Sequence, residues 1–225
     1  MSEAGSRYVA VGEIRETLDG GLQAAGIFLF LLAAQFMVVI MLGAAIAPGY
    51  DFNAAAISDL GVVPATALLF NVSLVVVGVF NVLGGYLFYR AHGARWLLAL
   101  FALAGIGAIG AGVFTLENPT GLHGLFALLA FLFFNLQAIG SATRLRGPMK
   151  LLAVVAGALG LVFVVLMALG DGGNTAVFAL FGHGGTERMI VYPPMLWLLA
   201  FGGYLMAGES GPTLRAADGT EQPSD

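Results

Sequence analysis

Three polar segments, each between two long apolar runs, hold the side chains of this 225-residue sequence that could do chemistry. These side chains are Ser58, Asp59, Glu117, His123, Glu187 and Arg188. They offer carboxylates and an imidazole as proton acceptors, and a guanidinium that can bind an anion. If the apolar runs cross a membrane, all three segments fall on the same side of it. We therefore expect the six residues to form one polar constellation on the outer face.

The same segments contain groups that could hold a metal. Neutral imidazole is a common metal ligand, and a nearby carboxylate can orient it. His123, His183 and Asp59 could thus bind a zinc ion that activates water, although the helical HExxH signature is absent. A nucleophilic triad of Ser58, His123 and Asp59 is another arrangement of the same groups. The sequence does not decide whether the protein is an enzyme.

Structural roles remain open for the same residues. Ser58 and Asp59 suit the first turn of a helix that begins near Ala54, because they can accept from its free backbone N–H groups. Arg188 is the only basic residue in the outer segments. We expect it either to extend to the membrane interface or to pair with Asp59, Glu117 or a lipid phosphate.

The apolar runs between these segments define the class of protein. Hydrophobic residues make up 59% of the chain and charged residues 10%, with a mean hydropathy of +0.93. A soluble domain is roughly 45–50% apolar and about 25% charged. This composition excludes a soluble domain, a disordered chain and a nucleic-acid-binding protein, and the absence of cysteine excludes thiolate chemistry. The sequence predicts an integral membrane protein.

The predicted fold is all-α, a bundle of six transmembrane helices. A span needs about 20 residues, and the apolar runs lie at 21–47, 64–89, 96–115, 122–142, 151–170 and 188–207. Eight of the nine basic residues lie on one side of these spans, which predicts that both termini are cytoplasmic. Residues 1–20 form a cytoplasmic segment that could be an interfacial helix, 21–208 form the membrane domain, and 209–225 form a disordered cytoplasmic tail.

Small and polar residues within the spans predict how the helices pack. Ala104, Ala108 and Gly112 recur every four residues, a spacing that lets helix backbones approach closely. We expect close packing within the chain, with a homo-oligomer through this third span as the alternative. The amides in the second and fourth spans should hold helices together. Pro193 and Pro194 should break or kink the last span, where freed carbonyls can line a cavity.

At these positions the sequence resembles the DUF998 family of multi-pass membrane proteins of archaea and bacteria. The matching pieces are Ile57-Ser58-Asp59-Leu60-Gly61, Pro64, Phe70-Asn71, His123-Gly124, Glu187-Arg188 and Trp197. The resemblance covers residues 21–207 and implies a six-helix bundle in the plasma membrane, without a particular reaction. The Pro193-Pro194 pair and the long third outer segment depart from the family pattern.

The favoured function is a non-catalytic one, in which an outward-facing polar pocket binds a lipid headgroup or a membrane partner. Arg188 would bind an anion, and acids and amides would bind hydroxyl groups. A metal-dependent hydrolase or transferase acting on membrane lipids is the first alternative. A small-solute transporter is the second, although no charged residue lies near the centre of a span, which argues against an ion pump.

Overall fold

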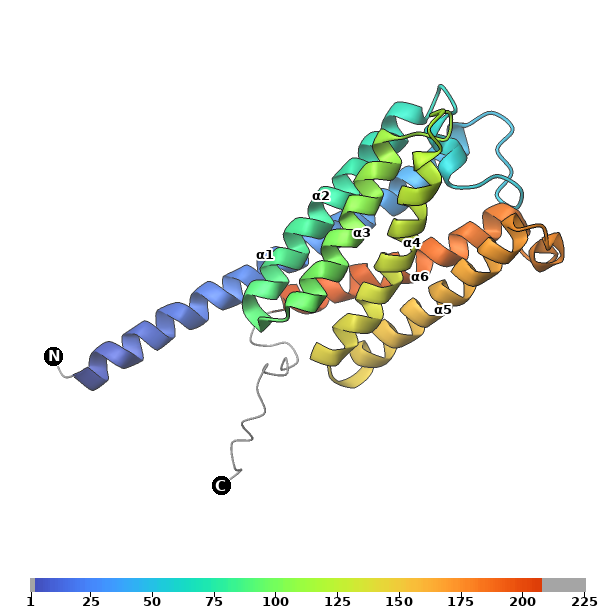
Figure 1. Cartoon of the computed structure of the whole chain (residues 1–225). Coiled ribbons are helices and arrows are strands. Elements are labelled where there is room, and N and C mark those ends of the chain that lie inside the picture. The colour runs from blue at the N-terminus through green and yellow to red at the C-terminus, as the bar shows by residue number, and fades with distance from the viewer. Residues whose placement is uncertain (1–2, 208–225) are drawn as a thin grey trace.

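The computed structural model describes residues 3–207, with side chains from residue 20 onward, and its described part consists of helices and their connections, without strands (Figure 1). The long helices are α1 (Glu3–Ile46), α2 (Ala67–His92), α3 (Arg95–Val113), α4 (Leu122–Ser141), α5 (Gly147–Asp171) and α6 (Gly182–Met206). Short 3₁₀ helices are η1 (Ser58–Gly61), η2 (Ala142–Arg144) and η3 (Thr175–Phe178). Six helices in the described chain are long and apolar enough to cross a membrane, which confirms the predicted fold class. The predicted tail, 209–225, lies outside the described residues.

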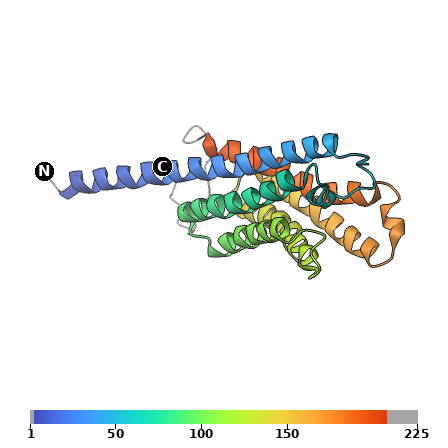
Figure 2. The same cartoon turned by 90° about the horizontal axis from the view of Figure 1, so that it is seen from above.

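The helices form a closed ring in chain order. Each long helix packs against the next one along the chain, and α6 packs against α1 to complete the ring (Figures 1 and 2). Gly26 and Gly202 permit this last contact, because a Cβ atom on Gly26 would lie 2.6 Å from the Gly202 carbonyl oxygen. An even number of spans brings residues 20 and 206 to one end of the bundle. We call the other end, with residues 47–66, 114–121 and 172–181, the outer end after the predicted orientation.

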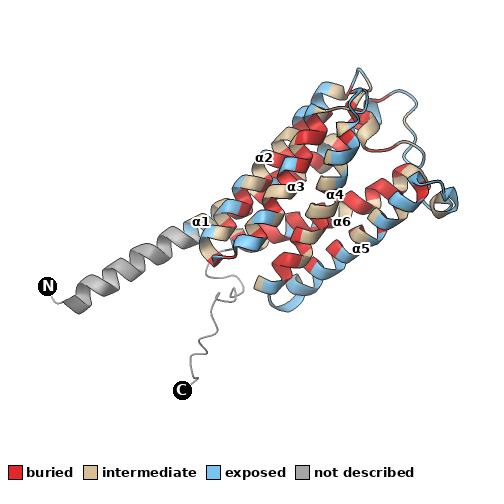
Figure 3. Cartoon of the chain, viewed as in Figure 1, coloured by how far each residue is buried: buried red, intermediate tan, exposed pale blue. Residues whose placement is uncertain are grey.

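The bundle is apolar both inside and outside. Phe88, Phe101 and Phe201 are almost fully buried and bring α2, α3 and α6 together in the core. Large apolar side chains such as Leu68 and Leu125 are exposed on the outside, at 79% and 60% (Figure 3). This distribution suits a bundle surrounded by lipid, where apolar side chains need no shelter from water.

The small residues of α3 pack within the chain. Ala104 and Ala108 are buried, and a Cβ atom on Gly107 would lie 2.4 Å from the backbone nitrogen of Ala130 in α4. On the other side, a Cβ atom on Gly78 of α2 would lie 2.3 Å from a carbonyl oxygen of α3. The predicted close packing is thus intramolecular, and the homo-oligomer stays a prediction.

Buried amides join three of the helices, as expected for the spans. Asn81 and Gln137 donate to each other's side-chain oxygens, at 2.9 and 3.0 Å, and Asn81 also donates to the Phe101 carbonyl at 2.8 Å. Both side chains are fully buried. The reciprocal bonds join α2 to α4, and the bond to Phe101 adds α3, inside the membrane where an unpaired amide would be costly.

Two prolines lie inside α6, yet the helix is continuous from Gly182 to Met206, so the predicted break is not present. Pro194 has no N–H group to donate to the carbonyl of Ile190, one helical turn earlier. Asn135 of α4 supplies that hydrogen bond instead, since its Nδ2 lies 3.2 Å from the Ile190 oxygen and 2.7 Å from the Phe131 oxygen. The freed carbonyl therefore ties α6 to α4.

Candidate functional site

The outer segment 47–66 folds over the start of α6. This helix begins at Gly182, six residues before the predicted start of the last span. The Gly184 N–H donates to the Asn53 carbonyl at 2.9 Å, and a Cβ atom on Gly184 would lie 2.0 Å from the Ala55 carbonyl oxygen. A glycine is required at this contact, because any side chain would displace the segment. Glu187 and Arg188 consequently lie in the second turn of α6, facing this segment.

Arg188 holds the segment by its backbone. Its Nη1 donates to the carbonyls of Phe52, Ala55 and Gly184 at 2.7–3.0 Å, and its Nη2 donates to the Tyr50 hydroxyl at 2.6 Å. The guanidinium carbon also lies 4.8 Å from the centre of the Phe52 ring. The side chain is only 7% exposed, so it does not extend to the interface. Burial raises the pKa of Tyr50 above its usual range, although Arg188 acts in the opposite direction.

The carboxylate predicted to pair with Arg188 is not beside it. Within residues 20–207, no carboxylate oxygen lies within 4.0 Å of the guanidinium. Asp59 instead accepts from the Ala56 N–H at 2.8 Å, which stabilises the turn that opens η1. Glu117 is exposed and lines neither of the cavities described below. Arg188 does hold the outer segment, but through carbonyl oxygens rather than through an ion pair.

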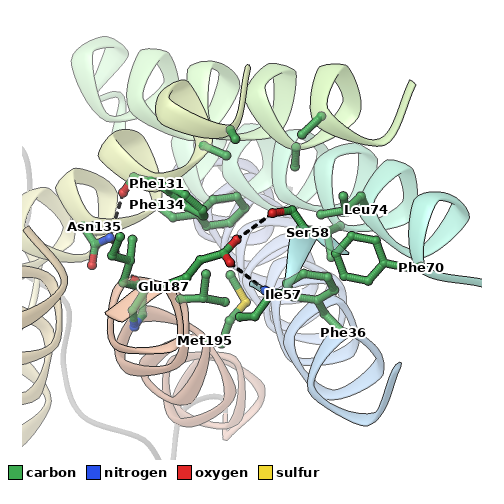
Figure 4. Close-up of a pocket in the computed structure, with 18 of the residues that line it drawn as sticks. Phe36, Ile57, Ser58, Phe70, Leu74, Phe131, Phe134, Asn135, Glu187 and Met195 are labelled. Carbon is green, nitrogen blue, oxygen red and sulfur yellow. Dashed lines mark hydrogen bonds between the residues drawn. The ribbon is translucent and has the colours of Figure 1, made fainter. Parts of the chain in front are cut away.

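Glu187 binds the same segment from another side. Its Oε2 accepts from the Ile57 N–H at 2.6 Å and its Oε1 from the Ser58 hydroxyl at 3.2 Å (Figure 4). The side chain is 4% exposed, and no basic nitrogen of the described chain lies within 4.0 Å of it. Two successive residues of α6 thus hold residues 50–58. The carboxylate of Glu187 is buried with neutral donors alone.

Glu187 and Ser58 lie on the wall of an inner cavity with about 570 Å³ of empty space, including the open space at its mouth. Its wall comes from α1, α2, α3, α4, α6 and the η1 segment, and is overwhelmingly apolar. Aromatic rings and a methionine form much of it (Figure 4), namely Phe36, Phe70, Phe131, Phe134 and Met195. The polar side chains of the wall are Ser58, His123, Asn135 and Glu187.

A lateral cleft adjoins the inner cavity. It lies between the first turns of α4 and the last turns of α5, the two helices that diverge toward the outer end in Figure 1. Its empty space is about 970 Å³, including the open space at its mouth. Ser58, His123 and Glu187 line both spaces, so they stand where the cleft meets the cavity. Asp171 and His183 line the cleft but not the inner cavity.

His123 presents a fixed acceptor at this junction. Its Nδ1 lies 3.1 Å from the Ala111 carbonyl oxygen and 2.8 Å from the Phe114 carbonyl oxygen. Carbonyl oxygens only accept, so Nδ1 carries the proton and Nε2 of the neutral ring is an acceptor. Nε2 is buried and has no hydrogen-bond partner in the described chain. The end of α3 thus fixes the tautomer of a histidine on α4, a pairing that spacing in the sequence did not suggest.

Comparison with known proteins identifies the family. A family model described as a protein of unknown function, DUF998, matches residues 16–204. The chain belongs to the DUF998 family. No curated protein and no solved structure gives a significant match. The DUF998 match includes Ser58, His123 and Glu187, but its description assigns no activity, so an account of function depends on the site itself.

The catalytic arrangements considered for this DUF998 protein are not assembled in the described chain. His183 lies 3.1 Å from Asp171 through its Nε2, and no group of three or more His, Asp or Glu residues between 20 and 207 is arranged to hold a metal. The Ser58 hydroxyl donates to Glu187 rather than to His123, and Asp59 is engaged elsewhere. The structure brings together Ser58, His123 and Glu187, and leaves Asp59, Glu117 and Arg188 outside both cavities.

Proposed function

We propose that this protein binds a single-chain amphiphile from the cell membrane, with its apolar chain in the inner cavity and its polar head at Ser58, His123 and Glu187. The observation behind this proposal is the junction of an apolar cavity with a lateral cleft, at which three polar side chains meet. An amphiphile matches this arrangement, because its apolar chain fits the cavity and its polar head fits the junction. The role is binding without catalysis, in keeping with the polar pocket expected from the sequence.

The lining supports this class of ligand. Ligand pockets in proteins are mostly apolar, with a few polar groups that orient the ligand. The wall of the inner cavity has this composition, with four polar side chains among apolar ones. A water-soluble metabolite would leave most of the aromatic wall without a suitable partner. An alkyl chain would fill it, and could enter sideways from the membrane between α4 and α5.

The position of the head differs from the one expected from the sequence. Arg188 was the expected anion-binding group, but its Nη atoms contact four protein oxygens and it lines neither cavity. We therefore assign Arg188 to holding the outer segment. Glu187, which binds that segment too, also faces the ligand space.

Photo-crosslinking tests the proposal. Purified protein in phosphatidylcholine nanodiscs would be irradiated with dodecanol that bears a diazirine in the chain and a terminal alkyne. Labelled peptides would be identified by mass spectrometry. We expect labelling of cavity residues such as Phe131 and Met195, and we expect unlabelled dodecanol to compete with it.

Two tryptophan substitutions on α4 separate the cavity from the lipid-facing surface. Ala127→Trp places a large ring where the cleft meets the cavity, and should remove most of the competable labelling. Leu125→Trp, at a side chain that is 60% exposed, is the matched control and should leave the labelling unchanged. Labelling restricted to lipid-facing residues, or equal in both variants, would contradict the proposal.

A further inference from the structure

The ionisable side chains that line the inner cavity or the lateral cleft are acids and histidines. They are His123, Asp171, His183 and Glu187. Two of them are acids, and no lysine or arginine of the described chain lines either space. Any head group at the junction therefore meets an acidic side chain and hydrogen-bond acceptors. This favours a cation and disfavours a carboxylate or a phosphate.

Among residues 20–207, no basic nitrogen lies within 4.0 Å of the Glu187 carboxylate. It is 4% exposed, and its oxygens accept from a backbone N–H and a hydroxyl, both of which are neutral. Arg188, the next residue, is engaged with carbonyl oxygens of the outer segment. A buried carboxylate is costly unless an opposite charge or a full set of donors compensates it. A positively charged ligand at the junction would supply that charge.

The Nε2 atom of His123 adds a second, independent requirement for a donor. Its partner ring nitrogen is held by two carbonyls, so Nε2 of the neutral ring can only accept. It is buried without a partner in the described part of the chain. A hydroxyl group has one proton to donate, whereas a primary ammonium group has three and accepts none. The ammonium can satisfy the carboxylate and the imidazole together.

We infer that the head group bound between Glu187 and His123 is a protonated primary amine carried on a single apolar chain. This inference rests on the proposed function, because it assigns the chemistry of the ligand that the cavity is proposed to hold. The amine donates to a carboxylate oxygen of Glu187 and to Nε2 of His123. The chain extends from there into the inner cavity.

A comparison of head groups on one chain tests the inference in the wild-type protein. Dodecylamine, dodecanol and dodecanoate would each compete with the dodecanol photoprobe in phosphatidylcholine nanodiscs at neutral pH. We expect dodecylamine to compete at a concentration about tenfold lower than dodecanol, since a hydrogen bond to a charged group is the stronger one. Dodecanoate should be the weakest of the three.

Variants at the junction identify the groups responsible. Glu187→Gln keeps a carbonyl oxygen for the Ile57 N–H and removes the charge, so it should abolish the preference for dodecylamine over dodecanol. Asp59→Asn is the matched control, because it removes an acid of the outer segment that Glu187 binds, and Asp59 lines neither space. It should leave the preference unchanged, which excludes a general effect of surface charge. His123→Asn retains an N–H donor for the α3 carbonyls but lacks Nε2, and should weaken dodecylamine binding.

The outcomes separate the inference from the proposed function. Equal competition by dodecylamine and dodecanol, or strongest competition by dodecanoate, would overturn the amine and leave amphiphile binding in place. A preference that Asp59→Asn removes as fully as Glu187→Gln would also overturn it. Absence of competable labelling with every head group would overturn the proposed function and the inference together. If Glu187→Gln does not fold, Asp171→Asn at the rim of the cleft tests the charge, with a smaller loss of preference expected.

Discussion

The hydrogen bond between α4 and α6 at the proline pair gives a prediction that can be measured as a coupling energy. Asn135 donates to the Ile190 carbonyl, which lacks its helical donor because Pro194 has no N–H. Asn135→Ala removes the substitute donor and leaves a buried carbonyl unpaired. Pro194→Ala restores an N–H at the right place in the helix. The cost of Asn135→Ala should therefore be smaller in a protein that also contains Pro194→Ala.

The size of this coupling energy can be estimated from the two hydrogen bonds that Asn135 donates. Its bond to Phe131 runs within α4, where the Phe131 carbonyl already has a helical partner, so losing it costs little. Loss of its bond to Ile190 leaves a buried carbonyl without a donor, which costs about 1–3 kcal/mol. Measured interhelical couplings in membrane bundles average about 0.6 kcal/mol and reach about 1.7 kcal/mol. We expect a coupling of about 1 kcal/mol.

The assay is a double-mutant cycle from reversible unfolding in mixed micelles of mild detergent and dodecyl sulfate. Pro193→Ala replaces Pro194→Ala in a control cycle, because Pro193 frees the carbonyl of Met189, to which Asn135 does not donate. That control should be additive to within about 0.5 kcal/mol. Additivity in the Pro194 cycle, or the same coupling in both cycles, would refute the account of this helix contact.

Further predictions concern the outer segment. Arg188→Lys loses the planar guanidinium and its contacts with the aromatic rings, and should lower the free energy of unfolding by about 2 kcal/mol. The matched control Arg90→Lys changes an exposed pair with Tyr86 and should change the free energy of unfolding little. Gly184→Ala should increase proteolysis of residues 47–66, because its Cβ atom would strike a backbone carbonyl there, whereas Gly203→Ala, with open space around it, should not. Burial raises the pKa of Tyr50, so the stability from this neutral hydroxyl is complete below its ordinary pKa of 10.0 and is lost as the pH rises above it. Tyr50→Phe should make the melting temperature less sensitive to alkaline pH.

Hydropathy was sufficient for the spans because a lipid-facing helix must be apolar along its whole length. It failed at the start of α6, where Gly182-His183-Gly184-Gly185 has the composition of a loop. Gly182 and Gly184 are needed there because the carbonyls of Asn53 and Ala55 pass too close for any other side chain, which is a tertiary constraint. The break predicted at the proline pair is absent for a similar reason, since Asn135, on another helix, donates to the carbonyl that Pro194 leaves free.

The candidate site was only partly predictable. Ser58, His123 and Glu187 were singled out by their polarity in an apolar chain, and the structure brings them to one junction. The partners of Glu187 and Arg188 were not predictable, because adjacent residues on a helix point in different directions and their partners lie about 130 residues earlier in the chain. Which of them faced the cavity depended on how the ring of helices closes.

The closure of that ring has a consequence for biosynthesis. Helices enter the membrane in order from the ribosome, and residues 50–58 emerge long before Glu187 and Arg188, which hold them. Until α6 inserts, α1 lacks one of its two neighbours in the ring and the inner cavity lacks the wall formed by Ile190, Val191 and Met195. A nascent chain arrested after α5 would expose this polar segment without its anchors. Assembly of the inner cavity should therefore coincide with insertion of the last helix, and quality-control proteases should recognise chains stalled before that step.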